Sequence, residues 1–445
     1  MDLEGFVRRR LASTPRPALV ELVRDRILEH KETDARAALE LARAVIEEVE
    51  VSLRATSPVC TMRPSGVSMG RFGVGSRGTG DMHVHRSLAG IIGSTGAEVD
   101  ALDLDDAGVV ACTGGHLVVT VDGMHSRLSE FPLLAGFHVA RAALRDVWVM
   151  GARPLAMLAD VHVADDGDVA RVFEFVAGVA AVGELTGVPL VTGSTLRIGG
   201  DLVLGERLTG CVGAVGETAR LTPRRALEAG DLLLMTEGGG GGTITAAAIY
   251  GGFPEVVEET LNVQLLDACA DLAARPEWGS VHAMTDVTNG GLRGDAHEMA
   301  ATTGLGIVVD RGLAAGLVRP AVARMLDSLR IDPLGVSLDA LLVAAPPRVI
   351  DALGRALTEI GVRSEVIGEV RAEPGVRQRI DGEEREFAPR FRESAYTPVK
   401  KVVGEAAPED LDELARRVTE AAEHAKQRKA EVVRTVAARR TRATQ

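Results

Sequence analysis

The stretch FHVARAALRDVWVMGARPLAMLADVHVAD, residues 137–165, decides the fold class because it joins a helical pattern directly to a strand. Up to Gly151 the apolar residues recur at intervals of three and four, which is the spacing of a helix that buries one face. Gly151 stands just after this helical pattern, where glycine is favoured, and Pro154 follows Gly151. Residues 155–165 then have the character of a strand. This succession indicates an α/β protein.

The same alternation continues on either side of this stretch. Residues 116–122 (HLVVTVD) precede it as a strand, and a helical pattern that ends at Gly187 follows it. Two more strands are expected in residues 188–193 and 202–217. The first unit therefore reads strand, helix, strand, helix, strand, strand.

A second α/β unit is expected to begin near residue 220. Strands at 231–237 and 282–286 each lead through glycines into a helical pattern. Helices are also expected near the N-terminus, where Thr33 and Asp34 offer a cap, and after Pro408. The chain thus divides into a helical extension (1–56), a unit that opens with a glycine-rich loop (57–219), a second unit (220–371), and an irregular segment with a charged C-terminal helix (372–445).

The composition of the chain argues against several classes of protein and partner. Of 445 residues, 46% are hydrophobic and 25% are charged, the balance of a globular protein, and the net charge of −13 disfavours nucleic acid as a partner. The absence of an apolar run of 18 residues or of a signal-like N-terminus predicts a cytoplasmic protein without membrane spans. Four widely spaced cysteines argue against structural zinc and a disulfide framework.

Aspartates are the candidate metal ligands. Asp103, Asp105 and Asp106 lie in LDLDDAG, and Asp122 ends the next strand, so these carboxylates could converge on a hard cation. The alternative is that DDAG is an ordinary turn. Asp146 lies in an otherwise apolar helix, where it needs a cation, a hydrogen-bond donor or water unless that position is exposed.

Glycine-rich junctions are the candidate phosphate sites. The run GGGGGT at 238–243 joins a strand to a helix, so its backbone N–H groups could hold a phosphate. It lacks the GK[ST] ending of a P-loop and is not a GxGxxG fingerprint. Asp286 and Asn289 stand at a strand end just before another glycine turn.

Five segments in order resemble the aminoimidazole ribonucleotide (AIR) synthetase-like superfamily: DDAGVV, VDGMHSRL, ALRDVWVMGARPLAML, VTGST and TDVTNGGLRGDAHEMA. This superfamily includes AIR synthetase, thiamine-monophosphate kinase, selenophosphate synthetase and HypE, and the resemblance covers about residues 75–371. It implies a two-domain α/β fold and a homodimer whose N-terminal strands close a barrel at the interface. The helical N- and C-terminal extensions lie outside it and are possible docking elements for a protein partner.

The resemblance also implies ATP and Mg²⁺ as cofactors and phosphoryl transfer as the chemistry. The metal ligands carried over by motif are Asp105, Asp106, Asp122 and Asp286. Asp146 is carried over as a catalytic residue, and the lid-like loop 66–80 suggests Arg77 and Arg86 as clamps on phosphoryl oxygens. The nucleotide-binding residues expected on this basis are Gly75, Gly78, Gly80, Thr195, Gly239, Gly240 and Asn289.

Departures from the family pattern limit the reaction. The chain has Ser194 where a GDT-type motif has an aspartate, unless Asp201 replaces it. The loop 66–80 has no cysteine and the chain ends in ATRATQ, so the selenophosphate synthetase and HypE reactions lose their nucleophile. We expect an enzyme that activates a carbonyl, amide or phosphate oxygen of a small molecule. The alternatives are a small-molecule kinase and a nucleotide-binding regulatory or scaffold subunit without turnover.

Overall fold

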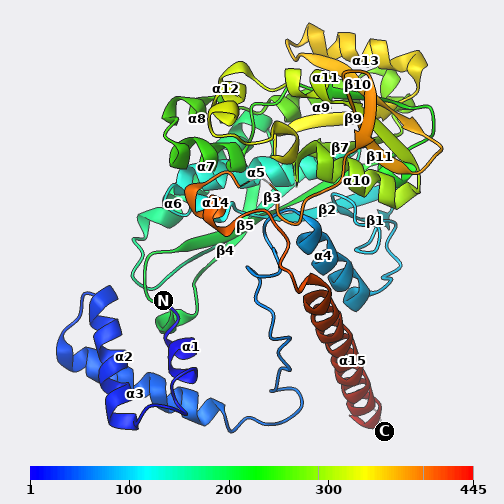
Figure 1. Ribbon diagram of the computed structural model, residues 1–445. Coiled ribbons are helices and arrows are strands. Elements are labelled where there is room, and N and C mark those ends of the chain that lie inside the picture. The colour runs from blue at the N-terminus through cyan, green and yellow to red at the C-terminus, as the bar shows by residue number, and fades with distance from the viewer. Residues whose placement is uncertain (289, 394, 444–445) are drawn as a thin grey trace.

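Two β-sheets with helices packed on them form the body of the protein (Figure 1). The computed structural model describes residues 1–288, 290–393 and 395–443. The first sheet has the order β1-β2-β5-β3-β4, with β3 and β4 parallel and the other neighbours antiparallel. Its strands are β1 (Gly108–Cys112), β2 (Gly115–Gly123), β3 (Arg153–Val163), β4 (Leu190–Arg197) and β5 (Leu208–Thr218).

The second sheet has the order β12-β11-β8-β10-β6-β9-β7, and only the pair β8 and β11 is parallel. Its strands are β6 (Leu232–Thr236), β7 (Ala283–Val287), β8 (Gly306–Asp310), β9 (Ala340–Ala345), β10 (Ser364–Arg371), β11 (Gly375–Ile380) and β12 (Glu383–Glu386). The mixed α/β class is confirmed, and the expected strands and helices of both units occur in the expected order, but β1 was not expected. The first sheet is open within one chain, with β1 and β4 at its edges.

Helix α5 (Pro132–Val149) lies between the two sheets and contacts β2, β3 and β5 on one side and β7 and α9 on the other. Proline stands at its first position, and Gly151, at φ +84°, follows its last turn as expected. Nearly every residue from Ala135 to Val149 is buried. A helix buried on all sides needs polar partners for each charge it carries.

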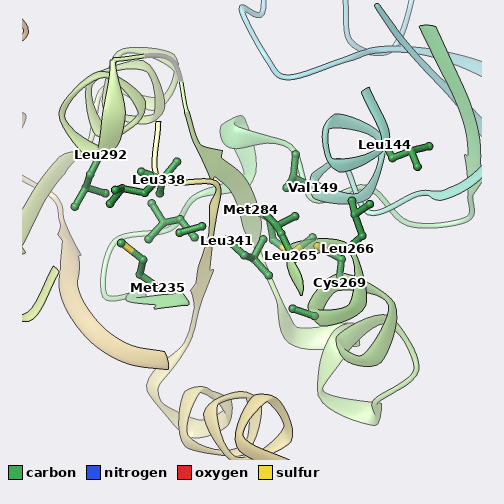
Figure 2. Packing of buried hydrophobic residues seen from close by; sticks show 14 of the residues in the cluster. Leu144, Val149, Met235, Leu265, Leu266, Cys269, Met284, Leu292, Leu338 and Leu341 are labelled. Carbon is green, nitrogen blue, oxygen red and sulfur yellow. The ribbon is translucent and has the colours of Figure 1, made fainter. Parts of the chain in front are cut away.

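Helices of the second unit surround its sheet. They are α7 (Gly242–Gly251), α8 (Val257–Thr260), α9 (Gln264–Ala273), α10 (Gly291–Thr303), α11 (Arg311–Gly316), α12 (Pro320–Ser328) and α13 (Pro347–Glu359). Figure 2 shows the apolar contact that joins the units, where Leu266 and Cys269 of α9 lie beside Leu144 of α5 and Met284 of β7. The cores of the two units are therefore continuous.

The N-terminal extension consists of helices α1 (Leu3–Arg8), α2 (Arg16–His30) and α3 (Ala35–Ser52). The predicted cap is present, because the Asp34 carboxylate accepts hydrogen bonds from the backbone N–H groups of Arg36 and Ala37. These helices bury a small core of their own that also includes Leu204. In Figure 1 they stand apart from the sheets at the end of an extended segment.

Two segments differ from expectation. The supposed loop 57–96 contains helix α4 (Thr79–Ile92), whose glycines and histidines hide its helical spacing in the sequence. The segment after 371, expected to be irregular, contains β11 and β12, which extend the second sheet. Backbone pairing to β8 and ion pairs such as Arg371 with Glu384 hold this polar hairpin, so it carries little apolar pattern.

A C-terminal segment that we call the strap, residues 387–393 and 395–404, crosses back over the body and includes α14 (Pro398–Val403). Helix α15 (Leu411–Ala443) follows and packs against α4 (Figure 1). No helix in the described ranges combines the length and apolar character needed to cross a membrane.

The face of the first sheet that points away from α5 is apolar and exposed. The strand register places Val121 of β2 opposite Gly213 of β5, and Gly213 opposite Leu158 of β3. The exposed apolar residues on this face are Val110, Val119, Val121, Leu158 and Leu196. Exposed apolar patches of this kind mark interaction surfaces.

Close contact between α5 and α6 (Ala170–Thr186) depends on glycine. A Cβ atom at Gly136 would lie 2.0 Å from the Phe175 carbonyl oxygen. We predict that Gly136→Ala lowers the free energy of unfolding by about 1–3 kcal/mol through overpacking. The matched control is Gly90→Ala in α4, where a Cβ meets nothing within 4 Å, so stability should rise by about 0.5–1 kcal/mol. Thermal or urea unfolding measures both, and equal effects would refute the contact.

Candidate active site

A cavity of about 340 Å³ is lined by Asp81 of α4 and by five further aspartates from separate parts of the chain. We call it the acidic pocket. Two of its aspartates precede β1, one lies near the end of β2, one lies in the last turn of α5, and one lies in β7. In this order they are Asp105, Asp106, Asp122, Asp146 and Asp286. The structure thus brings together the five aspartates carried over by motif, whereas Asp103 lines a different cavity and pairs with Arg225.

Two buried arginines pair with some of these carboxylates. Arg145 of α5 forms ion pairs with Asp286 and, at 2.6 Å, with Asp339. Arg224 forms ion pairs with Asp106 and, at 2.6 Å, with Glu298. The sequence analysis missed both arginines, although a charged pair Arg145-Asp146 inside an apolar helix was a usable signal.

The remaining carboxylate charge is not fully compensated. Burial raises the pKa of Asp106 to about 8; Arg224 opposes this rise, while Asp286 and Asp105 add to it. Burial is also the main cause that raises the pKa of Asp146, and the charges of Asp286 and Asp122 add to the effect. Bringing a cation into the pocket would relieve this repulsion.

The carboxylate oxygens of the acidic pocket fit a Mg²⁺ ion that takes its remaining ligands from water and substrate phosphates. Within the described ranges no group of three His, Cys, Asp or Glu side chains is arranged to hold a metal by itself. Mg²⁺ typically takes one or two carboxylates and completes its shell with water and substrate phosphates. Asp122 suits this role, because it lines the cavity and has no ion pair within the described part of the chain. Burial raises its pKa as well.

A second cavity, of about 530 Å³, adjoins the first. We call it the basic pocket, because Arg77, Arg127 and Lys400 line it. The first turn of α7 opens onto it through Gly242 and Thr243. The residues that line both cavities, and so form their shared wall, are Arg77, Asp81, His85, Asp122, Arg145 and Thr288.

The glycine-rich loop that carries Arg77 is held in place from two directions. Asp81 at the start of α4 accepts hydrogen bonds from the backbone N–H groups of Gly75, at 2.7 Å, and Arg77. The strap bonds to the same loop through Glu393 N–H to Ser76 O, at 3.0 Å. Gly78 packs so closely on the strap that a Cβ there would lie 2.3 Å from the Phe391 carbonyl oxygen.

Several predicted residues lie elsewhere in the single chain. Gly75 lines the basic pocket and Gly78 the acidic pocket, but Gly80 packs against the Phe72 backbone. Arg86 lines a different cavity beside α10. The other positions are Thr195 on the exposed strand β4, Gly239 and Gly240 ahead of the two α7 residues that line the basic pocket, and Asn289, which lies outside the described residues.

Asp201 is not positioned to replace the carboxylate missing at Ser194 within one chain. Its side chain is 66% exposed and pairs with Arg197. Neither pocket includes it or Ser194 among its described lining residues. Within one folded chain, Asp201 therefore does not supply the carboxylate that a GDT-type motif has at the position of Ser194.

The strap contributes site residues that no sequence motif indicated. Tyr396 is hydrogen-bonded to His125 at 2.7 Å, and the Lys400 Nζ lies 4.2 Å from the centre of the Tyr396 ring. Burial, together with the nearby charges of Arg77 and Arg127, lowers the pKa of Lys400 to about 8, against the opposing effect of Asp81. Burial also lowers the pKa of His125 to about 3, so its imidazole is neutral at physiological pH.

Comparison with known proteins agrees with the two-unit architecture. Residues 104–218 match the model of the AIR synthase related protein N-terminal domain, and residues 228–381 match its C-terminal domain. The uncharacterized protein MJ1416 of Methanocaldococcus jannaschii is 46% identical over 447 residues, covering 97% of this chain and 98% of that protein.

Solved structures share the fold. AaThiL complexed with AMPPCP and TMP has a TM-score of 0.55 at 19% identity, covering 74% of this chain and 98% of that one. The hydrogenase maturation protein HypE in complex with ATP has a TM-score of 0.52 at 21% identity, covering 64% of this chain and 88% of that one.

The lowered pKa of Lys400 is directly measurable because the chain has only five lysines, at 31, 400, 401, 426 and 429. After reductive ¹³C-methylation, we predict one lysine resonance in the NMR spectrum that titrates near pH 8, well below the ordinary lysine value, and that disappears in Lys400→Arg. The ammonium of Lys400 should therefore lose its proton first as pH rises. Lys401→Arg is the control and should leave that resonance in place. If no resonance that depends on Lys400 titrates near pH 8, the buried position of Lys400 is wrong.

Proposed function

The chain belongs to the AIR synthase-related proteins, and from this membership we propose that it is an ATP- and Mg²⁺-dependent enzyme that transfers a phosphoryl group to an oxygen of a small molecule. The observation that carries the proposal is the pair of adjoining cavities, one rich in carboxylates and the other in cations. The binding of AMPPCP and of ATP by the two structural neighbours supports the choice of nucleotide.

In this proposal the acidic pocket binds the phosphates of ATP through Mg²⁺. Asp122, Asp106 and Asp286 are the proposed metal ligands, with Asp105 beside them. The bound metal would neutralise charge on the phosphoryl oxygens, which is the main requirement of phosphoryl transfer. Arg77 lines both cavities and has no ion pair within the described residues, so its guanidinium is free to hold a phosphoryl oxygen.

Asp146 is proposed as a catalytic residue beside these metal ligands. Its carboxylate accepts a hydrogen bond from the Thr120 hydroxyl at 3.1 Å and lies 3.9 Å from Arg145 Nε. Burial, together with the charges of Asp286 and Asp122, raises the pKa of Asp146, which suits a group that takes up a proton during the reaction. The acceptor would lie in the basic pocket, across the shared wall from the nucleotide.

The outcome of phosphorylation separates two versions of this proposal. A ligase or cyclase would use the phosphorylated carbonyl, amide or phosphate oxygen as an activated group and release phosphate. A kinase resembling thiamine-monophosphate kinase would release the phosphorylated product. No cysteine lines either pocket within the described ranges, which argues against a reaction that needs a thiol nucleophile there.

A nucleotide-binding regulatory or scaffold subunit without turnover is the third version. The helical extensions favour it, because they offer surface outside the matched domains. The gathering of six aspartates in one cavity argues for retained catalysis, since a scaffold has no need of so much uncompensated buried charge.

We also propose a homodimer in which the exposed apolar face of the first sheet meets its copy, as in the barrel that the family resemblance implies. Covering Val119, Val121 and Leu158 would remove apolar surface from water on both subunits. A two-fold interface of this kind is the commonest arrangement of soluble oligomers. Thr195 and Asp201 lie near the edge strand of this sheet, where a second subunit would approach them.

The dimer is tested by Leu196→Asp. Leu196 is 59% exposed, so the change should leave the fold intact but place a charge in the interface, and we predict a shift from dimer to the 46.8 kDa monomer in sedimentation at micromolar concentration. Val402→Asp, at a position 88% exposed in α14, should remain a dimer. A parent protein that sediments only as monomer would rule the interface out.

The phosphoryl-transfer proposal is tested with Asp122→Asn and Asp106→Asn. Mg·ATP should raise the melting temperature of the parent by preferential binding to the folded state, whereas NAD should not. Each variant should lose about 2–4 kcal/mol of transition-state stabilisation, or roughly 30- to 1,000-fold in Mg²⁺-dependent turnover of ATP.

The matched control is Asp351→Asn, which removes an exposed carboxylate of α13 outside both pockets. Its turnover should equal that of the parent. If the two pocket variants bind Mg·ATP and turn it over like the parent, the metal assignment is wrong. If Mg·ATP binds in the acidic pocket but the parent shows no turnover with any acceptor, the scaffold version is the better account.

A further inference from the structure

The basic pocket contains positive charge that the protein does not neutralise. Arg77, Arg127 and Lys400 line it, and none of the three has an ion pair within the described residues. The Arg127 Nε atom is buried without a hydrogen-bond acceptor in that part of the chain. Like charges brought together in a partly buried cavity repel one another, so their arrangement has to be justified by what they bind.

The acids that line the same cavity are already engaged. Asp81 accepts hydrogen bonds from the backbone N–H groups of the glycine-rich loop. Glu393 pairs with Arg293 at 2.7 Å and accepts from the Arg390 N–H at 2.7 Å. Asp122 belongs to the wall shared with the acidic pocket. The three cations therefore face the open part of the cavity without a dedicated counter-charge.

One of the three cations is supplied by the strap, which lies outside both family-matched regions. The strap is fixed on both sides of Lys400. Before it, Thr79 N–H donates to Arg390 O at 2.9 Å, and the Phe391 ring packs against Gly73. After it, Lys401 Nζ donates to Leu329 O at 2.9 Å. Lys400 is thus held at the cavity by structure specific to the C-terminal part of this chain.

We propose that the basic pocket binds the phosphate group of a phosphate-ester substrate, with Arg127 and the strap residue Lys400 as the residues that select for it. Three cations match a doubly charged phosphate better than a singly charged carboxylate. The first turn of α7, which opens onto the pocket at Gly242 and Thr243, adds backbone N–H groups that favour the same anion.

The role of this substrate as acceptor rests on the proposed function, whereas the anion site itself does not. With its phosphate at Lys400 and Arg127, the substrate would extend toward the shared wall at Arg77, Asp122 and Arg145. The phosphoryl donor would approach that wall from the acidic pocket. Lys400 and Arg127 are therefore positioned to select the acceptor without contacting the nucleotide, since neither lines the acidic pocket.

The experiment titrates full-length protein with inorganic phosphate by calorimetry at pH 7 and constant ionic strength, with sodium acetate as the carboxylate probe. Phosphate should bind the parent at least tenfold more tightly than acetate. Lys400→Gln and Arg127→Gln should each weaken phosphate binding tenfold or more, while Lys400→Arg, which keeps the charge, retains it. The matched control is Lys426→Gln, because Lys426 is exposed on α15, does not line the pocket and should behave like the parent.

Mg·ATP binding measured on the same proteins separates this proposal from the proposed function. Unchanged Mg·ATP binding together with weakened phosphate binding supports the site. Equal phosphate affinity in the parent, Lys400→Gln and Arg127→Gln overturns it, even if Mg·ATP still binds. Acetate binding as tight as phosphate overturns the choice of a phosphate ester. Phosphate binding that depends on Lys400, in a protein that does not bind Mg·ATP, supports the site and contradicts the proposed function.

Because Arg127 and Lys400 lie on different elements, loss of folding in one variant leaves the other to decide the result. Melting temperatures measured alongside the titrations identify such a loss. Arg127 stacks on the Tyr250 ring at 4.3 Å, so its variant also tests whether stability and phosphate affinity separate. A drop in affinity with an unchanged melting temperature is the expected outcome for both.

Discussion

The buried guanidinium of Arg145 is the interaction on which the arrangement of the site depends. Arg145 belongs to α5, which packs on the first sheet, yet its ion-pair partners Asp286 and Asp339 belong to the second sheet and its connections. A buried charge without a partner would be strongly destabilising, so α5 and β7 must keep this register. The same register brings Asp122 and Asp146 to the side of Asp286.

Charge is separated between the acidic pocket and the basic pocket. Arg145 and Arg224 neutralise part of the acidic pocket, and the remaining carboxylates have raised pKa values because they are buried near one another. On the other side of the shared wall, Arg77, Arg127 and Lys400 repel one another. Each cavity is thus more stable with a ligand of opposite charge, a cation in one and an anion in the other, and Arg77 and Arg145 lie where such ligands would meet.

Much of this architecture could be predicted from the sequence, because it depends on local patterns. The α5–β3 junction follows from apolar spacing and Gly151, and the aspartates follow from motifs at strand ends. Arg145 and Arg224 could not be assigned in the same way, since their roles come from partners more than 70 residues away. Helix α4 was not predicted because its glycines interrupt the apolar spacing of a helix. The hairpin β11–β12 was not predicted because ion pairs between its side chains replace the apolar alternation of a strand.

The strap shows how a distant segment can change a site without carrying a motif of its own. Its residues contact the glycine-rich loop by backbone hydrogen bonds, which any sequence can make, and among its described residues Glu393, Tyr396 and Lys400 line the cavity. The loop, the strap and α15 also hold one another, through Arg392 to Gly70 O and Arg71 to Asp410. The basic pocket is therefore complete only when the C-terminal part of the chain has folded onto the N-terminal loop, which couples the chemistry of the pocket to a long-range contact of the fold.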